Sequence, residues 1–193
     1  MQTSSANTAE LPDHPVIAAT RTWLEKAVIG LNLCPFAKAV YIKQQIRYVL
    51  SRAKEVDVLM TELESELLAL QAADPAKIDT TLIIIPDALS DFLDYNDFLT
   101  VADNLLEELE LDGEIQIASF HPQYQFAGTK ADDIENYTNR SPYPILHLLR
   151  ETSIERAADA FPEAEMIFKK NMETLRELGY DGWQKLDLLP KPG

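Results

Sequence analysis

The sequence predicts a single α/β domain with a small, mainly parallel three-stranded sheet (strand–helix–strand–helix–strand) and further helices at both ends. Three short segments, 46–51, 80–85 and 115–120, are rich in β-forming residues. The stretches between them show the helical spacing of apolar residues, and a helix between successive strands is typical of parallel pairing. With 193 residues, 46% of them hydrophobic, the chain is long enough to build one such domain.

The N-terminal part of the domain is expected to be helical. Apolar residues recur at helical spacing over 16–31, after a proline that suits the first turn of a helix, and Gly30 is expected near the end. A short helix is expected to begin at Pro35. The first strand follows at 46–51 (IRYVLS).

The middle of the chain supplies the two crossover helices. A leucine stripe over 56–70 predicts a long helix that ends before an Asp-Pro pair. The nearly continuous apolar run at 80–85 (TTLIII) predicts a strand buried on both faces. The helix over 95–109 follows a capping residue, Ser90 or Asp91, and an Asp-Gly turn leads into the third strand.

Residues 121–144 interrupt this alternation. They form a long irregular stretch with four aromatic residues and three prolines. Loops of this length in compact domains are usually functional or disordered, and the aromatic content of this one argues against disorder. Helices are expected after it, over 144–158 and 162–178. The alternative fold is an α+β domain in which Tyr124–Gly128 returns as an antiparallel edge strand.

The domain is predicted to span residues 14–180, with a tail at 181–193. Residues 1–13 carry no Lys or Arg and no apolar core, so we expect a disordered leader, no signal peptide and a cytoplasmic location. No stretch approaches 18 uninterrupted apolar residues, which argues against a membrane span. The single cysteine excludes an internal disulfide.

The charge of the chain argues against nucleic-acid binding. The net charge is −15, and a surface of that sign repels a phosphate backbone. Residues 61–120 hold fifteen acidic residues and one basic residue. We interpret them as the solvated faces of two helices; the alternative is a docking surface for a basic partner.

Ligands of open parallel sheets bind at the carboxyl ends of the strands, so the residues beyond the strands are the first candidates. These are Arg52, Pro86-Asp87 and His121, which opens the long irregular stretch. Imidazole titrates near neutral pH, so His121 is a candidate general acid or base. The alternative is a structural histidine that donates to a backbone carbonyl.

Cys34 is the candidate nucleophile. If Pro35 opens a helix, Cys34 is its N-cap, where the free amides and the helix dipole lower the pKa of a thiol. The alternative is a core cysteine packed beside Leu33 and Phe36.

Arg140 is the candidate anion-binding residue. With Ser141 as the N-cap of the expected 144–158 helix, the free amides and the guanidinium would form a pocket for a carboxylate or phosphate. The alternative is an internal ion pair between Arg140 and Asp132 or Asp133. The predicted substrate-binding set also includes Asn139, Ser141, Tyr124 and Asn32.

Other chemistries lack their motifs. The sequence has no glycine-rich phosphate loop, dinucleotide fingerprint, HExxH or CxxC, and its one Cys and three scattered His argue against structural zinc. Magnesium stays open among 32 acidic residues, and no spacing identifies a cofactor or an oligomeric state.

Three segments together resemble a known family: 23–25 (WLE) leading into 32–37 (NLCPFA), 121–126 (HPQYQF), and 136–144 (NYTNRSPYP) followed by 146–151 (LHLLRE). They are similar to a bacterial family catalogued as domain of unknown function 1415, over about residues 14–180. The resemblance implies a cytoplasmic bacterial protein and brings no activity, cofactor or catalytic residue.

Two hypotheses follow. The first is a small-molecule enzyme with Cys34 as nucleophile, His121 as base and Arg140 holding an anionic group. The second is a non-catalytic domain that binds an anionic metabolite in the same cleft or docks a protein on its acidic helices. The enzyme requires Cys34 and His121 within hydrogen-bond reach, and the binding domain requires only the pocket.

Overall fold

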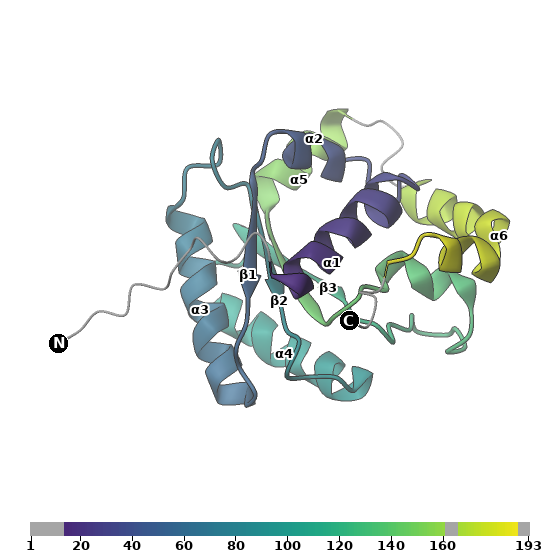
Figure 1. The fold of residues 1–193 in the computed structure, drawn as a ribbon. Helices are drawn as coiled ribbons and strands as arrows, with labels where there is room; N and C mark the ends of the chain where they lie inside the picture. The colour runs from purple at the N-terminus through teal and green to yellow at the C-terminus, as the bar shows by residue number, and fades with distance from the viewer. Residues whose placement is uncertain (1–13, 161–165, 189–193) are drawn as a thin grey trace.

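The computed structural model describes residues 14–160 and 166–188 and shows a mixed α/β domain with a four-stranded sheet (Figure 1). The predicted leader lies outside these residues. In chain order the elements are α1 (Pro15–Trp23), η1 (Leu24–Ile29), α2 (Ala37–Ile42), β1 (Ile46–Leu50), α3 (Val56–Ala72), β2 (Thr80–Ile84), α4 (Phe92–Glu108), β3 (Ile115–Phe120), η2 (Ile134–Asn139), β4 (Ile145–Arg150), α5 (Glu151–Ala160) and α6 (Ile167–Lys185).

The sheet has the order β1-β2-β4-β3. β1 pairs parallel with β2, and β4 pairs antiparallel with both β2 and β3. The three predicted strands therefore run in one direction, but β4 separates the second from the third. The α/β class is confirmed, and the expectation of a three-stranded, mainly parallel sheet is wrong in strand number and order.

β4 occupies the first part of the helix that we predicted over 144–158. Its sequence, ILHLLR, is a short apolar run whose periodicity does not separate a buried strand from a buried helix. β2 on one side and β3 on the other provide hydrogen-bond partners for its backbone amides and carbonyls. The segment therefore forms a strand, and α5 begins only at Glu151. The alternative edge strand at Tyr124–Gly128 is not formed.

Two apolar clusters lie on opposite faces of the sheet. On one face, α3 and α4 pack against alternate strand residues, among them Ile83, Leu146 and Leu148. On the other face, α1 and η1 pack against Leu82, Ile84 and Ile145. All five residues of β2 are buried, as the apolar run predicted, because this central strand is covered on both faces.

The carboxyl ends of β1, β2 and β3 meet at one edge of the sheet, together with the start of β4. Tyr95 of α4 joins two strands at this edge. Its hydroxyl donates to the Ile145 carbonyl (2.7 Å) and accepts from the Phe120 amide (3.1 Å), while the side chain is fully buried. The Tyr95 side chain therefore fills the centre of this edge, between the ends of β3 and β4.

The last helix packs beside the long irregular segment rather than on the sheet (Figure 1). α6 consists of two helices that meet at Gly179, whose φ of 64° and ψ of 176° are not helical. The first ends at residue 178, as the sequence predicted, and the second continues to Lys185. The most extensive contacts of α6 are with η2, which lies inside the 121–144 segment. Within the described ranges, no helix is both long and apolar enough to cross a membrane.

Candidate functional site

His121 is held by the backbone at both ring nitrogens. The Gln123 amide donates to Nδ1 (3.0 Å), so the neutral ring carries its proton on Nε2 and donates it to the Leu89 carbonyl (3.0 Å). The residue is 0% exposed, and burial lowers the pKa of its imidazole. Phe92 and Tyr95 pack against the ring. This geometry matches the structural alternative, since neither nitrogen faces a cleft.

Arg140 serves the loop that contains it. Its Nε donates to the Tyr124 carbonyl (3.3 Å) and its Nη2 to the Ala131 carbonyl (2.5 Å), while the guanidinium lies 4.3 Å from the centre of the Tyr137 ring. Its hydrogen-bond partners are carbonyls, and neither of the expected carboxylates pairs with it among the described residues. Arg140 therefore closes the long segment on itself.

The neighbours of Arg140 also hold the backbone in place. Asn139 donates through Nδ2 to the Ser119 carbonyl (3.1 Å), and Ser141 donates through Oγ to the Tyr143 carbonyl (2.5 Å). The ring of Tyr124 packs against Phe92 and Phe126. Because a strand follows Pro144, Ser141 caps no helix, and the free amides on which the anion pocket depended are absent from this position.

Cys34 lies in the turn before α2, half-buried against the cluster that α1 and η1 form. α2 begins at Ala37, so Cys34 is not its N-cap residue. Backbone hydrogen bonds from Phe36 and Ala37 lower the pKa of the thiol, but desolvation is the larger effect and raises it overall. The expectation of a thiol activated by a helix terminus is therefore wrong in its direction.

The predicted catalytic pair belongs to opposite faces of the sheet. Cys34 packs with the residues of α1 and η1, and the ring of His121 packs with Phe92 and Tyr95 on the α4 side. The structure brings His121, Tyr124, Asn139, Arg140 and Ser141 into one loop region. It does not bring Cys34 to His121.

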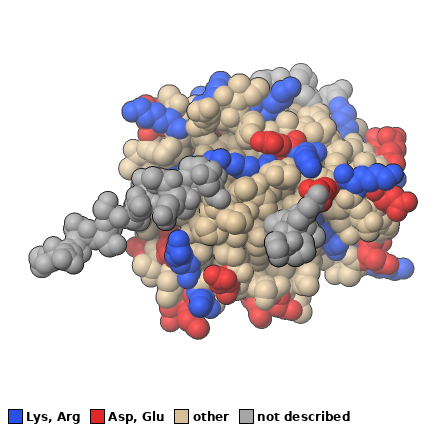
Figure 2. All heavy atoms as spheres, in the orientation of Figure 1, with Lys and Arg blue, Asp and Glu red and all other residues tan. Residues whose placement is uncertain are grey.

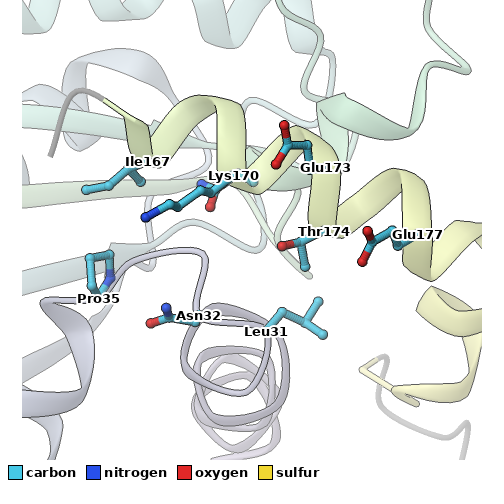
Figure 3. Close-up of a pocket in the computed structure, with 9 residues that line it drawn as sticks. Leu31, Asn32, Pro35, Ile167, Lys170, Glu173, Thr174 and Glu177 are labelled. Atoms are coloured by element: carbon cyan, nitrogen blue, oxygen red, sulfur yellow. The ribbon is translucent and has the colours of Figure 1, made fainter. Parts of the chain in front are cut away.

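A groove runs between the turn that follows η1 and the helix α6 (Figure 3). We call it the α6 groove. It encloses about 270 Å³. Its lining residues come from two segments, Leu31, Asn32 and Pro35 on one side and Ile167, Lys170, Asn171, Glu173, Thr174 and Glu177 on the other. Asn32 is the one member of the predicted site that lines it.

The turn side of the groove is fixed by an unusual end to the first helix. The π-helix η1 closes with hydrogen bonds from Gly30 to the Glu25 carbonyl and from Leu33 to the Val28 carbonyl (2.9 Å each). Asn32 then takes a left-handed backbone (φ 55°), which asparagine tolerates better than most residues. This backbone places Asn32 and Pro35 along the groove and Leu33 in the core.

α6 joins the groove to the long segment. Asn171, 5% exposed, donates to the Leu33 carbonyl (2.8 Å) and ties the helix to the turn. Elsewhere along the helix, Phe168 packs edge-on against Phe126, and Arg176 pairs with Glu135 of η2 (2.6 Å). The segments 32–37 and 121–144 are thus held by the same helix.

The charged groups of the groove were missed by the sequence analysis. Lys170, Glu173 and Glu177 lie on the polar side of an amphipathic helix, a pattern that usually indicates a solvated face. Their spacing of three, four and seven residues places them on one side of α6, and nothing in the sequence relates that side to Asn32. In the described ranges, no cluster of three or more His, Cys, Asp or Glu could hold a metal ion.

Comparison with known proteins yields a family and no activity. A family model described as Protein of unknown function (DUF1415) matches residues 15–185. No curated protein and no solved structure matches the chain.

Proposed function

This chain belongs to the DUF1415 family, and we propose that it is a non-catalytic domain that binds one small molecule in the α6 groove. The observation that carries the proposal is the lining of this groove. A turn that carries Leu31, a left-handed Asn32 and Pro35 faces α6, whose lining side chains are mostly polar or charged. A concave site that combines several polar groups with some apolar surface can orient a small ligand.

The binding hypothesis is favoured over the enzyme because the catalytic candidates have other roles. Both nitrogens of His121 are engaged with the backbone, and burial raises the pKa of the Cys34 thiol, which lowers the fraction of reactive thiolate. A nucleophile and its base must approach within hydrogen-bond distance. These two side chains pack on opposite faces of the sheet.

The size of the groove limits the ligand. Sites for drug-sized molecules and cofactors span roughly 300–1,000 Å³. At about 270 Å³, the α6 groove suits a single small metabolite better than a dinucleotide or a folded partner.

The proposal is tested by filling the groove. The NMR amide spectrum of the full chain is recorded with a panel of amino acids, carboxylates, amines and sugars at millimolar concentration. We expect one class to shift the signals of Asn32 and Thr174, and Thr174→Trp to abolish those shifts because the indole occupies the groove. Thr100→Trp, on the exposed face of α4, is the matched control.

Two results would contradict the proposal. One is a panel in which no compound shifts residues of the groove. The other is a compound whose binding survives Thr174→Trp unchanged, which would place the site elsewhere.

A further inference from the structure

We infer that the outer edge of β1 is a docking site for an extended acidic segment of a partner protein, which adds to the sheet as a further strand. This site is separate from the α6 groove, and nothing in it depends on the function proposed above. Two features carry the inference: a row of backbone groups without partners in the described part of the chain, and a basic stretch of sequence around them.

β1 is an outer strand of the sheet, and one side of its backbone is open (Figure 1). The Ser51 amide, just after β1, donates to the Ile84 carbonyl of β2 (2.9 Å). In a parallel sheet, the backbone groups of successive residues point alternately toward the two sides of the strand. Counting back from Ser51, the residues whose amides and carbonyls point away from β2 are Ile46, Tyr48 and Leu50. Among the residues that the structure describes, no hydrogen bond reaches these groups.

The outer strand at the other end of the sheet, β3, is partly covered. The Ile115 amide donates to the Leu111 carbonyl (3.0 Å), and the Ser119 carbonyl accepts from the Asn139 side chain of the long segment (3.1 Å). An open edge is a template for another strand, and covering it is one way in which proteins prevent such pairing. Because β1 has no such cover in the described ranges, its edge is the better template.

The sequence around the open edge is basic. Residues 38–54 hold five basic residues and no acidic residue, whereas the whole chain has a net charge of −15. Arg47 is paired with an acidic side chain of α3 (2.8 Å). Lys43, Arg52 and Lys54 are exposed, and no described residue forms an ion pair or hydrogen bond with their charged groups. These three cations stand before and after β1, at the two ends of the open edge.

The cations make a second copy of this chain a poor occupant of the edge. Antiparallel pairing of two β1 strands about their centre would place Lys43 of one copy between Arg52 and Lys54 of the other. Like charges facing each other across a strand pair destabilise it. An acidic segment has the opposite effect, because its carboxylates meet the cations while its backbone pairs with the open edge. In this mode of recognition the main-chain hydrogen bonds give affinity, and the charges select the partner.

The spacing of the cations sets the length of the segment. From Ile46 to Arg52 the chain advances by six residues, which is about 20 Å for an extended strand. An extended segment of at least about seven residues, with acidic residues at both ends, matches this length. Tyr48 and Leu50 pack with the apolar cluster of α1 and η1, so apolar side chains suit the middle of the segment on that face.

Three peptides test the docking site on the folded full chain. The first is Glu-Asp-Val-Thr-Val-Thr-Val-Asp-Glu with blocked termini, and the second has lysine in place of its four acids. The third has proline in place of the five central residues, so it keeps the charge but has no central amide to donate. By NMR titration, we expect the Kd of the first peptide to be at least about fivefold lower than that of the second, since one exposed ion pair contributes up to about fivefold. The third should not bind.

Amide hydrogen exchange locates the bound peptide. In the chain alone, the amides of Ile46, Tyr48 and Leu50 should exchange faster than those of Arg47 and Val49, which face β2. At a concentration of the acidic peptide about ten times its Kd, the exchange of the three outward amides should slow about tenfold, because only the unoccupied edge exchanges.

Two variants test the cations at the ends of the edge. Lys43→Gln and Arg52→Gln should each raise the Kd of the acidic peptide about two- to fivefold, because each removes one exposed ion pair. Lys130→Gln is the matched control, since it removes an exposed cation of the long segment, and it should leave the Kd unchanged. The amide spectrum shows whether each variant is folded.

Several results would overturn the docking site. Absence of binding by the acidic peptide would do so, as would equal Kd values for the acidic and lysine peptides. Equal binding of the proline peptide would show attraction by charge without strand pairing. Protection of the outward amides that rises with protein concentration, without peptide, would assign the edge to a second copy. Tighter binding of a single-stranded oligonucleotide than of the acidic peptide would assign the basic stretch to nucleic acid.

Discussion

At the scale of single residues, the polar side chains predicted to form the site in the long segment instead hydrogen-bond to main-chain carbonyls. His121, Asn139 and Arg140 each bond to main-chain carbonyls, at Leu89, Ser119, Tyr124 and Ala131. A segment without regular structure leaves many backbone groups without a ladder partner, and burying them unpaired is costly. Polar side chains at these positions are therefore explained by the backbone they satisfy.

The thiol of Cys34 should react slowly in the folded protein. Burial raises its pKa, so at pH 7 it holds less thiolate than a free cysteine. We expect iodoacetamide to label the native chain more slowly than N-acetylcysteine, and labelling to reach the free rate in urea. Since Cys34 is the only cysteine, mass spectrometry reports on it alone. A native rate equal to or above that of N-acetylcysteine would restore the nucleophile hypothesis.

The stability of the fold should depend on the protonation of His147. Thr80 donates its hydroxyl proton to the Leu148 carbonyl (2.6 Å), so the imidazole donates from Nε2 to Thr80 Oγ1 (2.7 Å). Desolvation lowers the pKa of His147 to about 4. Below pH 6.5 the unfolded chain binds a proton that the folded chain does not, so this residue destabilises the fold as the pH falls from 6.5 toward 4.

The variant His147→Gln serves as the reference for this effect. Its side-chain amide can still donate a hydrogen bond to Thr80, but it has no group that titrates in this pH range. Between pH 7.5 and pH 5, the free energy of unfolding of the parent should fall by about 2 kcal/mol more than that of the variant. Urea unfolding at both pH values measures the difference. The same fall in both proteins would show that the pKa of His147 is not lowered by folding.

At the scale of elements, the change from α1 to the π-helix η1 decides where the groove lies. A π turn adds one residue to the helical turn, is rare, and is frequently found at functional sites. Here it delivers Leu31 and Asn32 to the groove and leaves Gly30 closely packed against the preceding turn. In a regular α-helix of the same length, the residues of the following turn would lie at a different angle around the helix axis and would not face α6 in the same way.

Gly30→Ala tests this turn. Gly30 has helical φ and ψ (−63°, −38°), a conformation in which alanine ordinarily stabilises a protein by about 0.4–1 kcal/mol. A Cβ here would lie 2.3 Å from the Lys26 carbonyl oxygen, so we expect the substitution to destabilise the fold by at least about 1 kcal/mol. Urea unfolding measures it, with Ser65→Ala on the exposed face of α3 as the control. A stabilised variant would exclude the tight π turn.

At the scale of the whole molecule, the negative charge is concentrated on the α3 and α4 side of the sheet. Residues 61–120 hold most of the excess of acids, and many of these acids lie on the exposed faces of the two helices. The face in Figure 2 shows a broad uncharged area near its centre with charged side chains mostly around it. The acidic side chains thus lie mainly on the solvated faces of α3 and α4, whereas the α6 groove is lined by both basic and acidic side chains.

These acids should be neutral toward stability. Glu64→Lys and Glu108→Lys each replace an exposed residue, so we expect changes in the free energy of unfolding within about 0.5 kcal/mol. Thermal or urea unfolding of each variant measures them. A loss of several kcal/mol would show that these carboxylates have structural partners, contrary to the solvated interpretation.

The sequence alone determined the class of the fold, the direction of three strands and the helices between them. These features depend on periodicity within 10–20 residues and on crossovers between neighbouring strands, which local sequence records. It also selected the 32–37 segment, part of which lines the groove. Its direction for the Cys34 pKa was wrong because burial, which local sequence does not measure, outweighs the nearby amides.

Only the tertiary structure decided the place of β4 and the site itself. ILHLLR becomes a strand because β2 and β3, distant in sequence, offer it hydrogen-bond partners on both sides. Likewise, Asn171 meets the Leu33 carbonyl across 138 residues of chain, and that contact holds α6 beside the turn that carries Leu31 and Asn32. Such pairings depend on which apolar surfaces are buried together and which polar groups form hydrogen bonds in the folded chain. The local sequence on either side therefore does not identify the partner.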